Sequence, residues 1–294
     1  KFIKLTALKV PNVIEAHHRI LIMEYVKGER LDNIKYIDNN HISRSDVSCC
    51  LSHIFNNMIF TPNVGLHCDP HGGNLAIRPH KPTSTNPHNF EIILFDHGLY
   101  RFPETQMRRD YARFWLALLD QDQDKMRLYA KRFANIDDDQ FPLFAAAITG
   151  RSIDVALHYD ITTRRSTEEI SSMTSRFIDG EFLPNLMTIL SRIPRIVLLI
   201  LKTNDLTRYL DECLDSPLGP ERTFLIMTQY CSQTVYGEDC EANDHNNQKW
   251  SIKWTLHYIW NWIRFERRRN QLYLYDTVLW CCLLYTSPSP RDTR

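Results

Sequence analysis

Glycine is scarce in this sequence, with 9 residues among 294, or roughly 3% where about 7% is usual. So little glycine favours a helical protein, because glycine weakens the interior of a helix. The scarcity also makes clustered glycines informative, and three of the nine are Gly72, Gly73 and Gly98. Catalytic or binding residues are therefore expected close to these three glycines.

The sequence has no excess of charge of either sign. Its 35 Lys and Arg residues balance 35 Asp and Glu residues, so no overall field attracts nucleic acid, which is not an expected partner. Hydrophobic residues make up 43% and charged residues 24%, which is ordinary for a folded domain and excludes a disordered tail. No two of the eight cysteines form a C-x-x-C pair, so zinc-ribbon and thioredoxin interpretations lack support, and buried reduced thiols are expected.

Neither end of the sequence has the features of a natural terminus. Residue 1 is Lys rather than Met, and no signal or transit peptide precedes the first strand-like pattern. Residues 282–294 resemble the translated read-through of a sequencing adaptor. We therefore expect an N-terminally truncated chain with a foreign tail.

Strand-like and helical patterns alternate in the first hundred residues. Lys9–Ile14 and Arg19–Val26 are predicted strands, and the second is apolar enough to be covered. A short helix is predicted around Arg30–Ile34. The clearest helix is Ser43–Phe60, with Ser43 as its N-cap. Two further strands are predicted at Leu75–Arg78 and Phe90–Phe95, on either side of an exposed loop at 79–89.

From Glu104 onward the pattern is helical almost throughout. One apolar stripe consists of Met107, Tyr111, Phe114, Trp115 and Leu118. Leu186–Leu201 is too short and too charged to span a membrane and is predicted to be a buried helix. Residues 238–248 are predicted to be a polar connection. The remaining predicted helices are Lys125–Phe133, Asp138–Ile148, Thr167–Phe177, Leu206–Leu214, Glu221–Tyr236 and Trp250–Tyr275.

Four of the six tryptophans fall in the last predicted helix and precede the basic run Arg267–Arg269. They could form a membrane-interface helix, since tryptophan and arginine favour that environment. The interpretation that we favour is a terminal helix that packs its aromatic side chains on the helical lobe. The four residues are Trp250, Trp254, Trp260 and Trp262.

Two loops concentrate the polar residues that could carry chemistry. Asp69 and Asn74 lie five residues apart in a turn rich in Gly and Pro, and Asp96 ends a predicted strand. Asn74 and Asp96 offer hard oxygen ligands suited to Mg²⁺ that bridges phosphate oxygens. Asp69 could then orient or deprotonate an attacking hydroxyl or water.

The spacing of these residues is that of protein kinases. His67–Asn74 reads HCDPHGGN, with the Asp-to-Asn spacing of the kinase catalytic loop, and Asp96–Gly98 stands where kinases have D-F-G. Upstream, Met23–Gly28 follows a strand as a kinase hinge does.

The joint pattern resembles the UbiB/aarF-domain (ADCK) family of atypical kinases over roughly residues 5–275. The run Asp96–Arg101 resembles its mitochondrial eukaryotic branch, and so do Ile193–Arg195 and Leu201–Leu206. The resemblance implies an α+β, mostly helical fold: a kinase-like C-terminal lobe with two remnant N-lobe strands and a helical C-terminal extension. The implied divisions are 1–28, 29–215, 216–281 and the tail 282–294.

The resemblance also implies roles for individual residues. Asp69 corresponds to the catalytic aspartate, and His67 would brace its loop. Asn74 and Asp96 correspond to metal ligands, so ATP and Mg²⁺ are the expected cofactors. Glu24 and Val26 would offer hinge backbone groups to adenine. Supporting positions are His71, Gly72, Gly73, His97 and Gly98.

Two departures from the family pattern matter. Gly72 stands where the family usually has proline, and glycine enlarges the number of alternative loop conformations. In addition, nothing matches the family's K-x-G-Q signature, its alanine-rich nucleotide loop, the strand lysine or its paired acid. We therefore expect this polypeptide alone to bind ATP poorly or not at all.

The implied function is that of an ATPase or a small-molecule or lipid kinase tied to ubiquinone or mitochondrial lipid homeostasis. A nucleotide and a lipid or membrane surface are the expected partners, and mitochondria the expected location. The first alternative is a catalytically inactive pseudokinase scaffold in lipid handling. The second is a metal-dependent hydrolase that holds zinc or iron through the His-x-Asp-x-His pattern at His67, Asp69 and His71, with Asp96 and His97.

Overall fold

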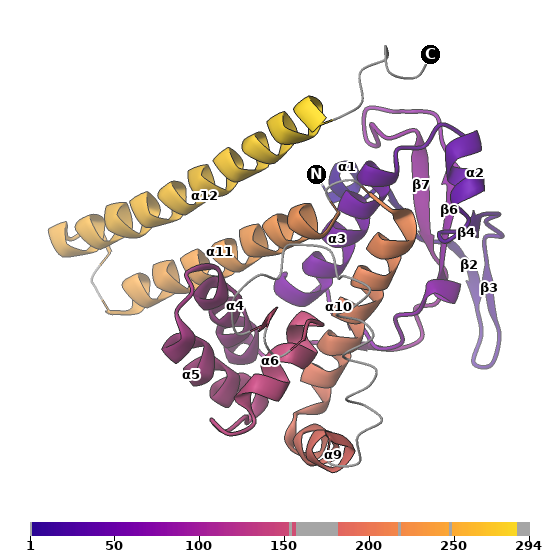
Figure 1. Ribbon diagram of the computed structural model, residues 1–294. Helices are drawn as coiled ribbons and strands as arrows, with labels where there is room; N and C mark the ends of the chain where they lie inside the picture. The colour runs from indigo at the N-terminus through magenta and orange to yellow at the C-terminus, as the bar shows by residue number, and fades with distance from the viewer. Residues whose placement is uncertain (1, 153–154, 157–181, 217–218, 247–248, 287–294) are drawn as a thin grey trace. The chain divides into compact units, whose positions relative to one another are not determined.

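The computed structural model describes residues 2–152, 155–156, 182–216, 219–246 and 249–286 (Figure 1). The chain divides into two compact units. The first contains residues 1–103 and 195–219, and the second contains residues 104–194 and 220–294. These units cut across the ranges 29–215 and 216–281 expected from the sequence. Taken as a whole, the described chain is mostly helical with small sheets, as predicted.

A four-stranded sheet lies in the first unit in the order β1-β7-β6-β4. Its centre is the antiparallel pair β6 and β7, at the positions predicted for two strands, in a register that places Leu75 opposite Leu94. Ile92 and Ile93 of β7 are fully buried. The strands are β1 (Leu8–Lys9), β4 (Glu29–Arg30), β6 (Leu75–Pro79) and β7 (Phe90–Leu94).

The two N-terminal strands differ from the prediction. Lys9 pairs with β7 in β1, whereas β2 (Val13–Ala16) forms a separate hairpin with β3 (Leu21–Met23). Pro11 interrupts the predicted strand because proline has no N–H for a ladder. The expected covering of the second strand is wrong: the residues of β3 are 41–55% exposed. An apolar run favours a strand but does not supply the surface that covers it.

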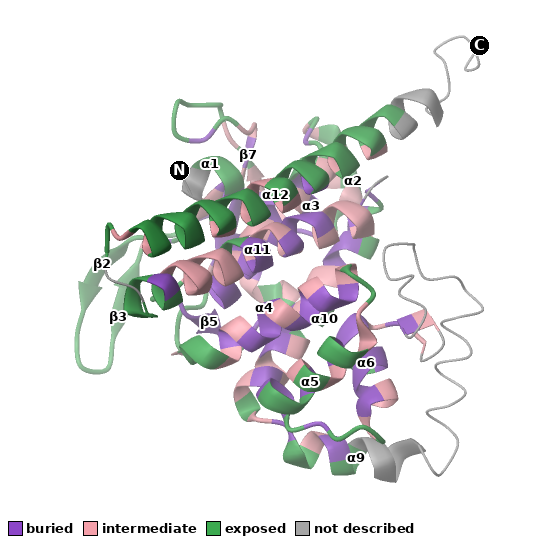
Figure 2. Cartoon of the chain, turned by 90° about the vertical axis from the view of Figure 1, so that its left-hand side faces the viewer, coloured by how far each residue is buried: buried purple, intermediate pink, exposed green. Residues whose placement is uncertain are grey.

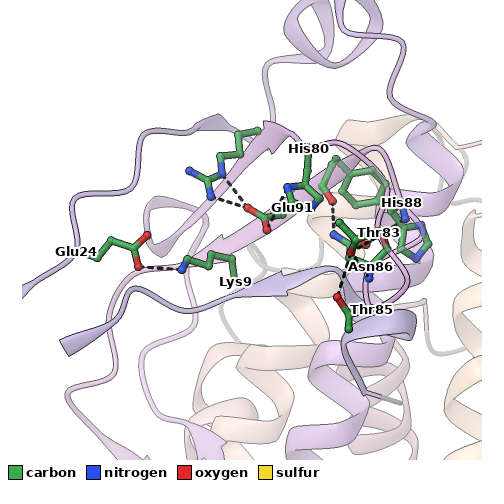
Figure 3. A network of polar contacts seen from close by, with 10 residues as sticks. Lys9, Glu24, His80, Thr83, Thr85, Asn86, His88 and Glu91 are labelled. Carbon is green, nitrogen blue, oxygen red and sulfur yellow. Dashed lines mark hydrogen bonds and ion pairs between the residues drawn. The ribbon is translucent and has the colours of Figure 1, made fainter. Parts of the chain in front are cut away.

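Polar side chains tie one end of the β6–β7 pair and its connecting loop together (Figure 3). Arg78 donates to Oε2 of Glu91 across the β6–β7 pair at 2.9 and 2.7 Å. In the connection between these strands, buried Asn86 donates to the carbonyl of Phe90 at 3.0 Å. The predicted exposed loop at 79–89 is therefore pinned from within by a buried amide.

The first unit also contains three helices from the N-terminal part of the chain. They are α1 (Phe2–Thr6), which precedes β1, and α2 (Ile34–Asn39) and α3 (Arg44–Phe60), which follow β4. Helix α2 starts later than the predicted short helix, because the side chain of Asn33 caps it by accepting from the N–H of Tyr36. Ser43 caps α3, as predicted, by accepting from the N–H of Asp46 at 3.2 Å.

A long helix, α10 (Arg195–Leu214), packs against α3. The hydroxyl of Ser48 on α3 donates to buried Asp211 on α10. The sequence instead predicted one helix over 186–201 and another over 206–214. Pro194 explains the difference, because proline ends α9 (Phe182–Arg192) and α10 then continues without interruption.

The second unit has an aromatic core between α4 (Thr105–Leu119), α5 (Gln123–Ala134) and α6 (Phe141–Thr149). The stripe predicted on the first of these helices is largely buried. Its rings meet edge to face with those of the neighbouring helices, an arrangement that aromatic pairs prefer. The core rings are Tyr111, Phe114, Trp115, Phe133 and Phe144. The helix predicted at 167–177 lies outside the described residues.

Helix α11 (Gly219–Asn246) includes most of the segment predicted to be a polar connection, so that prediction is wrong. The polar residues are explained by partners: Glu238 pairs with Arg113 and Glu241 with Arg109, both on α4. Helix α12 (Ile252–Thr286) follows and lies beside α11, with the ring of Phe265 stacked on Tyr236 at 4.6 Å (Figure 1).

Much of α12 faces away from the rest of its unit. Figure 2 shows it as a largely exposed helix, with Trp250 just before it 86% exposed and Ile252 at its start 83% exposed. The favoured prediction of tryptophans packed on the lobe is therefore wrong for Trp250, Trp260 and Trp262. No helix among the described residues is long and apolar enough to cross a membrane. Within the predicted tail, α12 continues to Thr286, and 287–294 lie outside the described part.

Candidate functional site

Two short strands bring the polar loops together. The pair β5 (Leu66–His67) and β8 (Tyr100–Arg101) is antiparallel, with His67 opposite Tyr100. The N–H of Cys68 also donates to the carbonyl of Leu99 at 3.0 Å. The first loop therefore begins where the second loop ends, although about thirty residues separate them.

His67 links the two loops through both ring nitrogens. The N–H of Asp69 donates to Nδ1 at 3.1 Å, and Nε2 lies 2.7 Å from the carbonyl oxygen of Asp96. Because an amide N–H only donates, Nδ1 accepts and Nε2 carries the proton given to Asp96. The ring is 3% exposed and meets Tyr100 edge-on at 5.3 Å. His67 thus holds the backbone of one aspartate against that of the other.

Asp69 projects a carboxylate that is more than half exposed. Its Oδ1 accepts from Nζ of Lys202 on α10 at 2.8 Å, and its Oδ2 lies 3.6 Å from Nε2 of His71. The hydrogen bond from Lys202 holds the pKa of Asp69 below its usual value, and the positive charge of the same lysine adds to this effect. The carboxylate is therefore ionised at neutral pH.

Asn74 and Asp96 are neighbours because of the sheet register. Asn74 immediately precedes β6, and its carbonyl accepts from the N–H of Phe95, the residue before Asp96, at 3.0 Å. The amide Nδ2 of Asn74 donates to the carbonyl of Asp69 at 3.2 Å, so Oδ1 is the atom left for a ligand. The carboxylate of Asp96 accepts from the N–H of Gly98 at 2.8 Å through Oδ1. Two such oxygen donors fit Mg²⁺, which takes one or two protein ligands and completes its shell with water or phosphate.

The turn between Asp69 and Asn74 is a short 3₁₀ helix, η1 (Gly72–Asn74), capped by His71. Nδ1 of His71 accepts from the N–H of Gly73 at 3.1 Å. A Cβ on Gly73 would come within 3.0 Å of that nitrogen, whereas a Cβ on Gly72 would meet nothing within 4 Å. A side chain at position 73 would crowd the ring of His71, whereas position 72 has room for one.

The second loop is held by a stack of two rings. His97 and Tyr100 lie nearly parallel, and the phenol oxygen is 2.8 Å from Nδ1. Nε2 of His97 donates to the carbonyl of Leu94 at 3.0 Å, so Nδ1 accepts from the phenol. Burial, followed by the charge of Asp96, raises the pKa of Tyr100 to about 12, which keeps the phenol protonated as a donor.

The predicted hinge residues lie in the segment without regular secondary structure that follows β3. Glu24 accepts from Nζ of Lys9 at 2.8 Å and from the N–H of Asn12 at 3.1 Å (Figure 3). Val26 is buried against Ala76 and Ile93 of the sheet. Among the described residues, no hydrogen bond engages the backbone of Val26, so its N–H and carbonyl remain available to a ligand. The side chain of Glu24 serves the local fold. Its N–H donates to the carbonyl of Asn12 at 2.8 Å, so its own carbonyl is the group left for adenine.

Comparisons with known proteins show which sequences this chain is similar to. Residues 1–130 match the model of the ABC1 atypical kinase-like domain. The chain is 68% identical over 282 residues to "ABC1 family protein MCP2" of Saccharomyces cerevisiae, covering 95% of this chain and 50% of that protein. It is 40% identical over 274 residues to the "ABC1 family protein MCP2 homolog" of Schizosaccharomyces pombe, covering 91% and 49%.

The chain belongs to the ABC1/AarF family. It is also 34% identical over 230 residues to "AarF domain-containing protein kinase 1" of Mus musculus, covering 78% of this chain and 42% of that protein. The chain spans about half the length of the curated relatives that it matches. The resemblance inferred from the two loops is thereby confirmed.

The geometry does not favour the hydrolase alternative. Both ring nitrogens of His67 and of His97 are engaged in hydrogen bonds, and Nδ1 of His71 caps η1. Within the described residues, no group of three His, Cys, Asp or Glu side chains is placed to hold a metal ion. The histidines of this ABC1-family site act as braces of the loops.

Two residues of the site carried no assigned role in the sequence. Lys202 was noted only within the family-like run Leu201–Leu206, and its contact with Asp69 joins residues 133 positions apart. Tyr100 was noted only as part of the motif after Asp96. A basic residue on a distant helix and a phenol next to a turn give no local signal of their position.

Proposed function

We propose that this ABC1-family chain carries the catalytic half of an ATP- and Mg²⁺-dependent phosphoryl-transfer site. The observation that carries the proposal is the joint placement of Asp69, Asn74 and Asp96 by one buried histidine and one strand register. A scaffold without turnover has no need to keep an ionised carboxylate beside two oxygen ligands. The reaction is ATP hydrolysis or transfer to a small-molecule or lipid hydroxyl.

Each residue has a distinct part in this chemistry. Asp69 accepts the proton of the attacking hydroxyl or water and orients it toward the γ-phosphorus. Asn74 and Asp96 would hold Mg²⁺, which when bound neutralises the negative charge that develops on the phosphate oxygens. His67 keeps the Asp69 and Asp96 backbones at a fixed separation, because its Nε2 donates to one and its Nδ1 accepts from the other. The backbone of Val26 would receive adenine.

The test compares Asp69→Asn and Asp96→Asn with the parent in a protein that spans the full length of the relatives. We expect each change to lower ATP turnover by roughly 100-fold or more, as loss of a catalytic base or a metal ligand does. Asp46→Asn is the matched control, because Asp46 is a carboxylate on α3 outside the loops. Normal turnover in both site variants would instead support the pseudokinase alternative.

A lipid surface is the second partner that we propose, and helix α12 supports it. Leu272 on one side of α12 is buried, whereas Ile252, Leu256 and Ile263 on the opposite side are exposed. Trp260, next to that face, is exposed as well, and tryptophan prefers the membrane–water interface. The exposed cations Lys253 and Arg267 flank the same face and would attract anionic phospholipids.

The lipid-linked role and the cellular location follow from the family rather than from the site. We propose a mitochondrial protein whose small-molecule or lipid substrate belongs to ubiquinone or membrane-lipid homeostasis. Retention of the loop residues supports turnover, and the exposed face of α12 supports work close to a bilayer. Imaging of the tagged full-length protein against a mitochondrial marker tests the location.

A further inference from the structure

A cation stands beside Asp69 although the loop that carries this aspartate contains none. Residues 67–74 read HCDPHGGN and residues 94–100 read LFDHGLY, without a single Lys or Arg. Transfer of a phosphoryl group requires positive charge at the group that moves. Lys202 supplies a charge-assisted hydrogen bond to the Asp69 carboxylate, with its Nζ 2.8 Å from Oδ1.

The position of Lys202 is fixed by the packing of α10. Ile200 and Thr203 on this helix are buried, and Leu206, one turn after Lys202, lines a small cavity with Pro70 and His71 of the loop. Residues four apart lie on the same face of a helix. Leu206 therefore faces the loop from the same side of α10 as Lys202, which contacts Asp69.

Stability does not account for this ion pair. The side chains of Lys202 and Asp69 are 49% and 59% exposed, and an exposed pair contributes about 0–1 kcal/mol. An ammonium group has three N–H donors, and in the described part of the chain Asp69 is the sole partner found for them. Because the side chain is about half exposed, its ammonium group has donors left for a ligand beside Asp69.

We propose that Lys202 contacts the phosphoryl group that is transferred, as the cation that the catalytic loop itself lacks. This inference rests on the proposed phosphoryl-transfer function. A hydroxyl that gives its proton to Asp69 lies one hydrogen bond from the carboxylate, and so does Lys202. The ammonium group is therefore within reach of the phosphorus that this hydroxyl attacks.

In the step itself, the bond between the γ-phosphorus and the bridging oxygen breaks, and its electron pair leaves with ADP. The oxygen of water or of an alcohol acceptor bonds to phosphorus, and its proton passes to Asp69. Lys202 donates hydrogen bonds to the non-bridging oxygens throughout and exchanges no proton. Such donors stabilise the charge that develops in the transition state.

The experiment uses a protein of the full length of the relatives and three variants: Lys202→Met, Lys202→Arg and, as control, Arg195→Met. Arg195 is an exposed cation on the same helix, two turns before Lys202. We expect Lys202→Met to lower kcat about 100-fold and to reduce the preference for ATP over ADP in binding about 10-fold. Lys202→Arg keeps the charge and should restore most of both, and Arg195→Met should change neither.

The outcomes separate this inference from the function on which it rests. If Asp69→Asn abolishes turnover but Lys202→Met leaves kcat and the ATP-over-ADP preference unchanged, Lys202 has no phosphate role and the inference is overturned. If neither Asp69→Asn nor Asp96→Asn changes turnover, the proposed function itself fails. Far-ultraviolet circular dichroism and thermal unfolding report that each variant is folded, and Lys202→Gln replaces Lys202→Met if that variant does not fold.

Discussion

At the residue scale, the site depends on hydrogen bonds that specify side-chain orientation more than on charge. His67 has a defined tautomer because Asp69 can only donate to it and the carbonyl of Asp96 can only accept from it. His97 is fixed in the same way by Tyr100 and Leu94. The acidic residues are thus positioned by neutral rings, and their carboxylates remain exposed for a ligand.

Gly72 permits a direct test of the loop. The residue before it, His71, is extended at φ −149° and ψ 156°, which is the conformation that a following proline requires. A Cβ at Gly72 meets nothing within 4 Å, and position 72 is the first residue of η1, where proline is favoured. We expect Gly72→Pro to raise the free energy of unfolding by about 0.4–1 kcal/mol, measured by urea denaturation.

A second glycine provides the control for that change. Gly65 has φ +84°, and a Cβ there would lie 3.1 Å from the ring of Phe102, so Gly65→Ala should destabilise the chain. A loss of stability in Gly72→Pro comparable to that of Gly65→Ala would contradict the described loop conformation.

At the scale of elements, a helix can be amphipathic in a way that a single buried face does not explain. Helix α11 has a polar half that turns out to pair with α4 through Arg109 and Arg113. Helix α12 has an apolar face on the side away from buried Leu272. The polar residues of α11 led to the wrong prediction of a connecting segment. The aromatic residues of α12 led to the wrong prediction of a helix packed through its tryptophans.

The proposed lipid contact of α12 predicts binding of this chain to vesicles. We expect cosedimentation with phosphatidylcholine vesicles that contain phosphatidylglycerol, and weaker binding without the anionic lipid. Leu256→Glu combined with Ile263→Glu should weaken binding at least about 10-fold, because apolar surface no longer enters the interface.

Ile14→Glu is the matched control for that pair, because Ile14 is an exposed apolar residue of the β2–β3 hairpin. Equal loss in the control would move the contact from α12 to the hairpin. Self-association of the unmodified chain, abolished by the α12 changes, would identify a second copy as the occupant instead of lipid.

At the scale of the whole molecule, the first unit contains both loops of the site. It also contains α10, whose Lys202 contacts Asp69 although the two residues are 133 positions apart in the sequence. The family's strand lysine and alanine-rich loop, by resemblance, match nothing within residues 1–294. In this chain the proposed nucleotide site therefore has neither of these two phosphate-binding elements.

We accordingly expect this chain alone to show no resolvable thermal shift with MgATP. A protein that spans the full length of the relatives should show a clear upward shift under the same conditions, since ligand binding to the native state stabilises it. A clear shift in the chain alone would mean that the two loops and the segment around Val26 suffice for nucleotide binding.

The sequence by itself predicted the two loops, strands β6 and β7 and the capped helix α3, because these depend on local spacing, caps and strand periodicity. Together with the kinase-like spacing, these signals predicted that Asp69, Asn74 and Asp96 lie close together, and the hydrogen bonds of the two loops bring them there. They could not determine the exposure of β3 or of α12, since an apolar pattern does not name its partner. Only the tertiary structure joined Lys202 to Asp69 and the polar half of α11 to α4, because contacts across more than a hundred residues are made by packing and leave no periodic signal in the chain.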